Sequence, residues 1–247
     1  MKINENLDIS FKDKLINRLS VKNISLNEQS INRLVEYKEM LIECNKTMNL
    51  TAITKDDEVI EKHFIDSLEC SKYIKESDKI LDVGTGAGFP GMVLSIALNG
   101  KPNITLLDSL NKRLIFLDDV IKKLDLKNIK TAHLRAEEGA NLQQYREKYD
   151  IVTSRAVASL NILLEYNIPY LKVGGKAIIM KGDNVSEEIE LSKNALKELN
   201  CKIISVNEYK LEVGDEIFTR NIIVVEKQAK TNTKYPRIFG KIKKSPL

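Results

Sequence analysis

A short glycine-rich segment, Leu81–Gly91, constrains the fold of this chain more than any other feature. An apolar run ends in Asp82 and is followed by Gly84, Gly86 and Gly88. Glycine lacks a Cβ, so this spacing allows a tight turn from a strand into a helix and lets the backbone approach a bound molecule closely. The segment therefore predicts a strand, a turn and a helix that together hold a compact ligand.

Short β-rich runs alternate with helical stretches from residue 79 onward. The runs are residues 79–83, 104–107, 129–133, 149–153 and 176–180. This alternation is typical of an α/β fold in which helices cover both faces of a parallel sheet. Two later runs, residues 202–206 and 221–225, have no helix between them, so they should pair antiparallel. We expect a Rossmann-like, mostly parallel sheet of seven strands with an antiparallel last strand.

The N-terminal third of the chain has a different, helical pattern. Apolar residues at helix-like spacing follow Ser25-x-x-Glu28, a sequence that resembles a capping box. A second helical stretch begins near Asp56, and it carries His63 and Asp66 three residues apart, on one face. We divide the chain into a helical cap packed on the catalytic domain (1–75), that domain (76–228) and a basic tail (229–247).

The basic residues are concentrated at the C-terminus. The formal net charge of the whole chain is +4, but residues 227–247 contain seven lysines and arginines and no acidic residue, which leaves about −3 for the rest. A local cationic segment suits a polyanion such as a nucleic acid. The alternative is a solvated terminus that serves only solubility.

Several classes of protein are disfavoured by what the sequence does not contain. No run of about 18 apolar residues is present and the N-terminus does not resemble a secretory signal, so we expect a cytoplasmic protein and no membrane contact. Three widely spaced cysteines and two histidines predict reduced thiols and no metal site. A monomer is the default expectation.

The glycine-rich segment fits two kinds of cofactor. Residues 86–91 match the dinucleotide pattern G-x-G-x-x-G, and Asp108 lies at the spacing of a ribose-binding carboxylate. Asp82 two residues before Gly84, Pro90 at the start of the helix and the terminal antiparallel pair favour S-adenosylmethionine over a nicotinamide cofactor. We expect a class I S-adenosylmethionine-dependent methyltransferase fold. A nucleotide-hydrolysing phosphate loop is excluded, because no glycine is followed by Lys-Ser or Lys-Thr.

An ordered set of short motifs resembles one bacterial family. The motifs are residues 49–53, 63–67, 81–91, 107–109, 135–138, 154–156, 181–182 and 235–237. From about residue 30 onward the chain is similar to the RsmG family, also called glucose-inhibited division protein B. The resemblance implies methylation of guanine N7 in the 530 loop of 16S ribosomal RNA, with S-adenosylmethionine as the methyl donor and the small ribosomal subunit or its RNA as partner.

The same resemblance suggests which residues bind the cofactor. Phe89 has a competing interpretation as a core aromatic, and Arg155 has one as a contact to an RNA phosphate. The candidates are Asp82, Gly84, Gly86, Gly88, Phe89, Asp108, Ala136, Glu137 and Arg155.

Residues for RNA contact and catalysis are less sharply indicated. Lys181, Tyr235, Arg237 and Lys241 are candidates for RNA contact, with Tyr235 stacking on a base and the others supplying charge. No catalytic residue is identified; the candidates are His63, Asp66 and Arg155, and His63 with Asp66 fits a structural hydrogen-bonded pair equally well. Deletion of residues 230–247 should impair RNA methylation and spare cofactor binding.

The expected chemistry needs no strong base. Guanine N7 carries an available lone pair at neutral pH, so orientation and electrostatics should suffice. The segment Asn167–Tyr170 resembles the Asn-Pro-Pro-Tyr element of amino-group methyltransferases but comes too late, and we interpret it as a helix end. Three alternatives stay open: a methyltransferase for another RNA, a protein or a small molecule, a nicotinamide-dependent oxidoreductase, and a non-catalytic ribosome-binding protein.

Overall fold

A seven-stranded sheet organises the molecule. The structure is a computed structural model, and it describes residues 9–247. The strands lie in the order β3-β2-β1-β4-β5-β7-β6, and β7 runs antiparallel to both of its neighbours. They are β1 Lys79–Val83, β2 Asn103–Asp108, β3 Ile129–His133, β4 Tyr149–Arg155, β5 Leu171–Lys181, β6 Cys201–Val213 and β7 Glu216–Lys227. The predicted mostly parallel sheet with an antiparallel last strand is confirmed.

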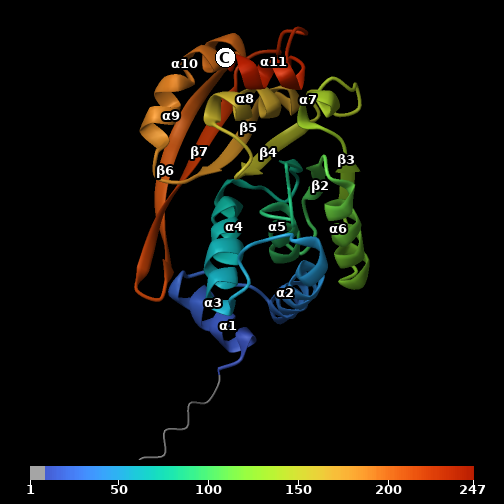
Figure 1. The fold of residues 1–247 in the computed structure, drawn as a ribbon, viewed down its shortest axis with the longest axis vertical. Helices are drawn as coiled ribbons and strands as arrows, with labels where there is room; N and C mark the ends of the chain where they lie inside the picture. Colours follow the sequence, from blue (N-terminus) through green and yellow to red (C-terminus); the bar gives the residue numbers. More distant parts are fainter. Residues whose placement is uncertain (1–8) are drawn as a thin grey trace, which may run out of the picture.

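Helices cover both faces of this sheet and form three layers with it (Figure 1). One face carries α1 Phe11–Val21, α2 Glu28–Met48, α3 Asp56–Glu58, η1 Val59–Ile65, α4 Asp66–Leu68, η2 Glu69–Tyr73, α5 Gly91–Ala97 and α6 Asn111–Lys123. The other carries α7 Ala136–Gly139, α8 Leu160–Asn167, η3 Ile168–Tyr170, α9 Val185–Leu191, α10 Lys193–Glu198 and α11 Phe239–Lys244. As expected, residues 168–170 form only the last turn after α8.

Strand periodicity explains why there are two hydrophobic cores. In β1, Ile80 packs with the first set of helices and Leu81 packs with the second, because successive side chains point to opposite faces of a sheet. Each fully buried aliphatic side chain of this kind contributes about 1.5–3 kcal/mol of transfer free energy. The central strands are therefore held from both sides, and the sheet edge at their carboxyl ends has a rigid base.

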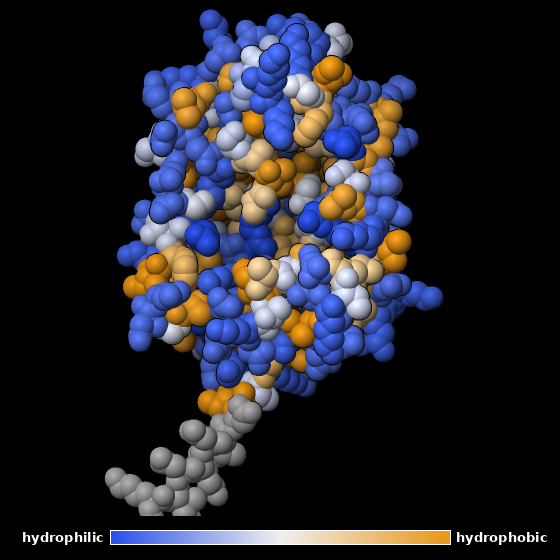
Figure 2. Space-filling view, viewed as in Figure 1, coloured by the Kyte–Doolittle hydropathy of each residue, from blue (hydrophilic) through white to orange (hydrophobic). Residues whose placement is uncertain are grey.

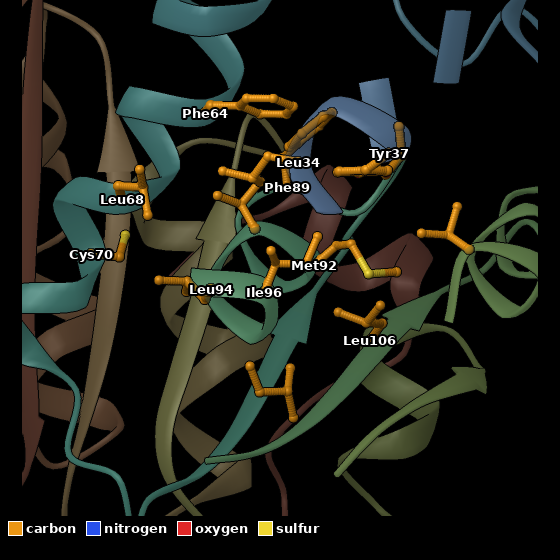
Figure 3. Packing of buried hydrophobic residues seen from close by; sticks show 14 of the residues in the cluster. Leu34, Tyr37, Phe64, Leu68, Cys70, Phe89, Met92, Leu94, Ile96 and Leu106 are labelled. Carbon is orange, nitrogen blue, oxygen red and sulfur yellow. The ribbon is translucent and has the colours of Figure 1, made fainter. Parts of the chain in front are cut away.

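The helical cap packs directly on the glycine-rich segment. Figure 3 shows Phe64 of the cap and Tyr37 of α2 around Phe89, with Met92 of α5 below them. The Tyr37 hydroxyl donates a hydrogen bond to the carbonyl of Ala87, within the glycine-rich turn. Cap and catalytic domain thus share one continuous core.

The predicted capping box at Ser25 is wrong. Helix α2 begins at Glu28, and its N-cap is Asn27, whose side-chain oxygen accepts a hydrogen bond from the backbone N–H of Ser30 at 2.8 Å. Asparagine is as good an N-cap as serine, and Asn27 directly precedes Glu28, the first residue of the helix.

The β6–β7 hairpin is longer than the sequence pattern predicts. Its two strands span residues 201–213 and 216–227, and the hairpin extends past the sheet toward the cap (Figure 1). Leu211 is fully buried against the cap, which explains why pairing continues beyond the apolar runs recognised in the sequence.

The C-terminal tail folds back onto the domain instead of extending as a basic arm. Its short helix α11 packs near α8 (Figure 1), and Ile242 is completely buried. On the face drawn in Figure 2, hydrophilic residues predominate and apolar residues occur in small groups. Within residues 9–247, no helix has the length and apolar character needed to cross a lipid bilayer.

Candidate functional site

The glycine-rich turn uses its glycines for different purposes. Gly84, Gly86 and Gly88 all have positive φ angles, of 69°, 61° and 106°, where other residues are strained. A Cβ on Gly84 would lie 2.7 Å from Cγ2 of Val157, whereas one on Gly88 would lie 2.6 Å from the Tyr37 hydroxyl. Gly84 therefore keeps a cavity open, and Gly88 allows the cap to approach.

Asp82 holds this turn together from inside. Its carboxylate accepts hydrogen bonds from the hydroxyls of Thr85 (2.6 Å) and Thr153 (2.9 Å) and from the N–H of Gly91 (3.0 Å). Burial raises the pKa of Asp82. Since the side chain is fully buried and surrounded by these donors, it positions the turn and does not line a cavity.

A cavity of about 440 Å³, here called the first cavity, opens at the carboxyl ends of β1, β2 and β4. Its walls include Gly84, Asp108, Ala136 and Glu137, together with apolar side chains and the basic residues Arg113, Arg135 and Lys243. Ligands of open α/β sheets bind at this edge. Four of the predicted cofactor-binding residues thus meet around one space.

Asp108 is held rigidly at the rim of the first cavity. The carboxylate accepts hydrogen bonds from the N–H of Gly86 (2.9 Å) and of Leu110 (2.8 Å), and Arg113 lies 3.3 Å away. These donors fix the direction of the carboxylate. An oriented carboxylate of this kind suits a ligand that presents hydroxyl groups.

Glu137 has a buried side chain whose carboxylate receives no hydrogen bond from residues 9–247. Its side chain lines the first cavity and is only 6% exposed, yet within residues 9–247 it accepts no hydrogen bond. Its oxygens are not among the fully buried polar atoms that lack a partner, so the carboxylate is open to the first cavity. The position therefore fits a bound molecule that donates a hydrogen bond there.

A second cavity of about 430 Å³ lies beside the first, and Ala156 lines both. The wall of the second cavity contains four basic side chains and two carboxylates: Lys62, Arg155, Lys181, Arg220, Asp66 and Glu188. Three of the basic groups are paired with carboxylates, but Arg220 has no carboxylate within salt-bridge distance among residues 9–247. The second cavity therefore has a net cationic wall.

Arg155 joins the sheet to the cap at this place. Its guanidinium donates to Oδ2 of Asp66 at 2.6 Å and to the carbonyl of Lys62 at 2.9 Å. Oδ1 of Asp66 accepts from the Tyr209 hydroxyl of β6 at 2.7 Å, and burial raises the pKa of Tyr209, which keeps that proton in place. Tyr209 lies 143 residues from Asp66 in sequence, so no local pattern pointed to it.

His63 belongs to the same cluster as a neutral ring. It stacks on Phe89 with the ring centroids 4.1 Å apart, and its Nε2 and Nδ1 lie 2.9 Å from Thr51 Oγ1 and 3.4 Å from Arg155 Nη2. Burial and the charge of Arg155 lower the pKa of His63 to about 3. A ring that is neutral and bonded at both nitrogens supports its neighbours and is a poor proton acceptor.

The structure separates the predicted site residues into three groups. Gly84, Asp108, Ala136 and Glu137 line the first cavity, and His63, Asp66, Arg155 and Lys181 line the second. The remaining predicted cofactor residues lie behind these walls and support them: Asp82, Gly86, Gly88 and Phe89.

Three predicted contacts are not supported by the position of the side chain. Arg155 faces the second cavity and pairs with Asp66, so its position does not support the predicted cofactor contact. Phe89 is 5% exposed and packs in the core against His63, which corresponds to its alternative interpretation. Tyr235 is 4% exposed and donates its hydroxyl proton to Glu198, so its position does not support stacking on an RNA base.

Of the other two candidates for RNA contact in the tail, one is held in an ion pair and the other is exposed. Arg237 is paired with the buried carboxylate of Glu165, whereas Lys241 is exposed on α11. Sequence reasoning missed Arg220, Phe239 and Tyr209, because an isolated arginine, phenylalanine or tyrosine outside a motif gives no signal.

Comparisons with known proteins identify the family of this chain. Residues 30–222 match the family model described as rRNA small subunit methyltransferase G. The chain belongs to the rRNA small subunit methyltransferase G family.

Curated members of this family are similar along nearly their whole length. The protein named ribosomal RNA small subunit methyltransferase G of Acetivibrio thermocellus is 48% identical over 97% of this chain and 98% of its own length. The protein of the same name from Clostridium tetani is 46% identical over 91% of this chain and 93% of its own.

Solved structures show the fold to be that of methyltransferases. NSun6 from Pyrococcus horikoshii superposes with a TM-score of 0.55 at 16% identity, covering 69% of this chain and 53% of that one. TYW2 from M. jannaschii, in complex with AdoMet, has a TM-score of 0.51 at 18% identity and covers 66% and 76% respectively.

Proposed function

We propose that this protein transfers a methyl group from S-adenosylmethionine to N7 of a guanine in the 530 loop of 16S ribosomal RNA. The observation that carries the proposal is the pair of cavities that meet at Ala156: the first brings Asp108 and Glu137 together beside the glycine-rich turn, and the second has a cationic wall. Membership of the rRNA small subunit methyltransferase G family names the RNA, and the exact base and loop rest on the motif resemblance.

The residues of the first cavity fit S-adenosylmethionine. Gly84 leaves room for a molecule against the backbone, and a Cβ there would be only 2.7 Å from Val157. Asp108 would accept from the ribose hydroxyls, and Glu137, which has no donor among residues 9–247, would accept from a further group of the nucleoside. The cofactor supplies an electrophilic methyl group when it is bound.

The second cavity fits a nucleotide of the RNA. Arg155, Lys181 and Arg220 give it a cationic wall for the phosphate backbone, which supplies most of the affinity of proteins for nucleic acids. The target base would enter this cavity and meet the cofactor where the two cavities share Ala156. Lys241, exposed on α11, would add a further phosphate contact.

The chemistry that these residues must perform is positioning. Guanine N7 attacks through a lone pair, so no proton is removed beforehand, and His63 with its pKa near 3 need not act as a base. The Arg155–Asp66 pair would orient the base and place a carboxylate near the positive charge that develops on the guanine. We propose that the protein works as a monomer in the cytoplasm, where its RNA substrate is.

Transfer of radiolabelled methyl from S-adenosylmethionine tests this function. Purified protein is incubated with unmodified small ribosomal subunits, with naked 16S RNA, and with protein and small-molecule acceptors, and the RNA is digested to nucleosides. Label in 7-methylguanosine from the 530 loop supports the proposal. Label in another nucleoside or another acceptor corrects the substrate, and tight binding of NAD in place of S-adenosylmethionine contradicts the reaction class.

A further inference from the structure

The first cavity has a wall that comes from the very end of the chain. Phe239 and Lys243 of α11 line it together with Gly84 of the glycine-rich turn, more than 80 residues after the strands that form its base. The sequence predicts cofactor-binding residues no further along the chain than Arg155, and it predicts only RNA contacts for the tail. The position of α11 calls for a different role.

A buried ion pair anchors this helix. The guanidinium and backbone N–H of Arg237 donate four hydrogen bonds, of 2.6–3.2 Å, to the carboxylate of Glu165, which is completely buried. Glu165 lies on α8, the helix whose Ile162 and Tyr166 also line the first cavity. The tail is therefore fixed to the same helix that forms another wall of the cavity.

A second arginine, Arg146, binds the part of the tail that precedes this ion pair in sequence. Arg146 donates hydrogen bonds to the carbonyls of Thr231, Asn232 and Tyr235, at 2.9–3.3 Å. A guanidinium that serves three tail carbonyls holds the backbone in one path. Together the two arginines place α11 at the cavity instead of leaving it in solvent.

Phe239 is the aromatic group that this arrangement presents. Its side chain is 43% exposed, and the Arg135 guanidinium lies 5.2 Å from the centre of its ring. An aromatic ring that remains this exposed while lining a cavity gains stability when a flat apolar ligand covers it. Leu134 and Ile162 extend the same apolar surface on neighbouring walls.

We propose that Phe239 is a cofactor-binding residue, which packs against the nucleoside part of S-adenosylmethionine, and that the Arg237–Glu165 pair positions it. The inference rests on the proposed function, since it concerns the same cofactor. It changes the expectation for the tail: deleting residues 230–247 weakens cofactor binding as well as RNA methylation.

Calorimetric titration of the full-length protein with S-adenosylmethionine tests the assignment without any turnover. Phe239→Ala lowers the affinity roughly tenfold, the effect of losing one aromatic contact, and Phe239→Tyr retains most of it. Ile238→Ala is the matched control, because Ile238 is 77% exposed, adjacent in sequence and does not line the first cavity. Its affinity stays at the wild-type value.

The positioning role of Arg237 has a separate readout. Arg237→Ala lowers the affinity by a similar factor, and the double variant Arg237→Ala/Phe239→Ala is no weaker than either single one, since both remove the same contact. Thermal unfolding of each variant checks that the domain stays folded. Wild-type protein that binds no S-adenosylmethionine overturns the proposed function, whereas wild-type binding with an unaffected Phe239→Ala variant overturns this inference alone.

Discussion

Arg155 and Asp66 form an ion pair of 2.6 Å between residues that are 89 positions apart in sequence. One comes from the end of β4 and the other from the helical cap, and the Tyr209 hydroxyl of β6 holds the second carboxylate oxygen. Three separate elements thus converge on one charged pair at the wall of the second cavity. The pair is fixed in direction before any RNA arrives.

The first prediction concerns this pair. Asp66→Asn keeps the shape of the side chain but removes its charge, so turnover should fall roughly 100-fold, the scale expected when one oriented electrostatic contact to the reacting group is lost. Affinity for S-adenosylmethionine should remain within about twofold, because Asp66 lies outside the first cavity. Steady-state kinetics and calorimetry measure the two quantities.

Asp57→Asn is the control for this variant, because Asp57 is an exposed acid of the same cap. It should change neither quantity. Weaker cofactor binding by Asp66→Asn would refute the assigned role.

The second prediction compares two adjacent glutamates. Glu137 is buried at the first cavity, whereas Glu138 is exposed. Glu137→Gln should weaken S-adenosylmethionine binding roughly tenfold or more, because it removes a charged acceptor. Glu138→Gln should bind like the wild type. Equal affinities for both variants in calorimetric titration would show that Glu137 does not contact the cofactor.

The third prediction separates backbone strain from loss of space. Gly84 and Gly174 both have positive φ, of 69° and 82°, but only a Cβ on Gly84 meets a neighbour, at 2.7 Å. Gly174→Ala should reduce the free energy of unfolding by about 1 kcal/mol through strain alone and leave cofactor affinity unchanged. Gly84→Ala should destabilise more and also weaken binding. Urea denaturation and calorimetry distinguish these effects.

The fourth prediction follows from the buried, neutral His63. Its pKa is lowered to about 3 in the folded protein, so between pH 6.5 and 3 the unfolded chain binds a proton that the folded chain does not. Stability is therefore lost as the pH falls through this window, by about 2 kcal/mol between pH 7 and pH 5 for this one group. Urea unfolding at the two pH values should show this loss in the wild type and a correspondingly smaller loss in His63→Gln.

The control for this measurement is built into the comparison, since His63→Gln leaves every other titratable group of the chain in place. An identical pH dependence in the wild type and His63→Gln would mean that His63 takes up its proton in the folded state.

The fifth prediction concerns Arg220, which has no carboxylate partner among residues 9–247. Arg220→Gln should weaken RNA binding and reduce its salt dependence, because one cation no longer displaces counterions from the phosphates. Cofactor affinity should not change. Arg33→Gln on α2 is the control, since Arg33 lines neither cavity. Binding isotherms at several salt concentrations that coincide for Arg220→Gln and the wild type would contradict the proposed contact.

Local patterns in the sequence determined the sheet and the turn that begins the site. The runs at residues 79–83 and 129–133 correspond to β1 and β3 to the residue. The central strand β1 is buried on both faces, whereas the edge strand β3 mixes buried with exposed residues. The glycines of residues 84–88 predict the turn, since only glycine tolerates positive φ and close backbone approach at little cost. The spacing after Gly86 also indicates Asp108 at the end of β2, whereas Glu137 is indicated only by the family resemblance.

Tertiary structure alone decided what surrounds these residues. The tail has the composition of a solvated basic arm, yet the buried carboxylate of Glu165 draws Arg237 inward, and that pairing brings Phe239 to the first cavity. Tyr209 reaches Asp66 only because the β6–β7 hairpin extends past the sheet to the cap. Such contacts join residues far apart in sequence, and their free energy depends on burial and geometry that a linear pattern does not contain.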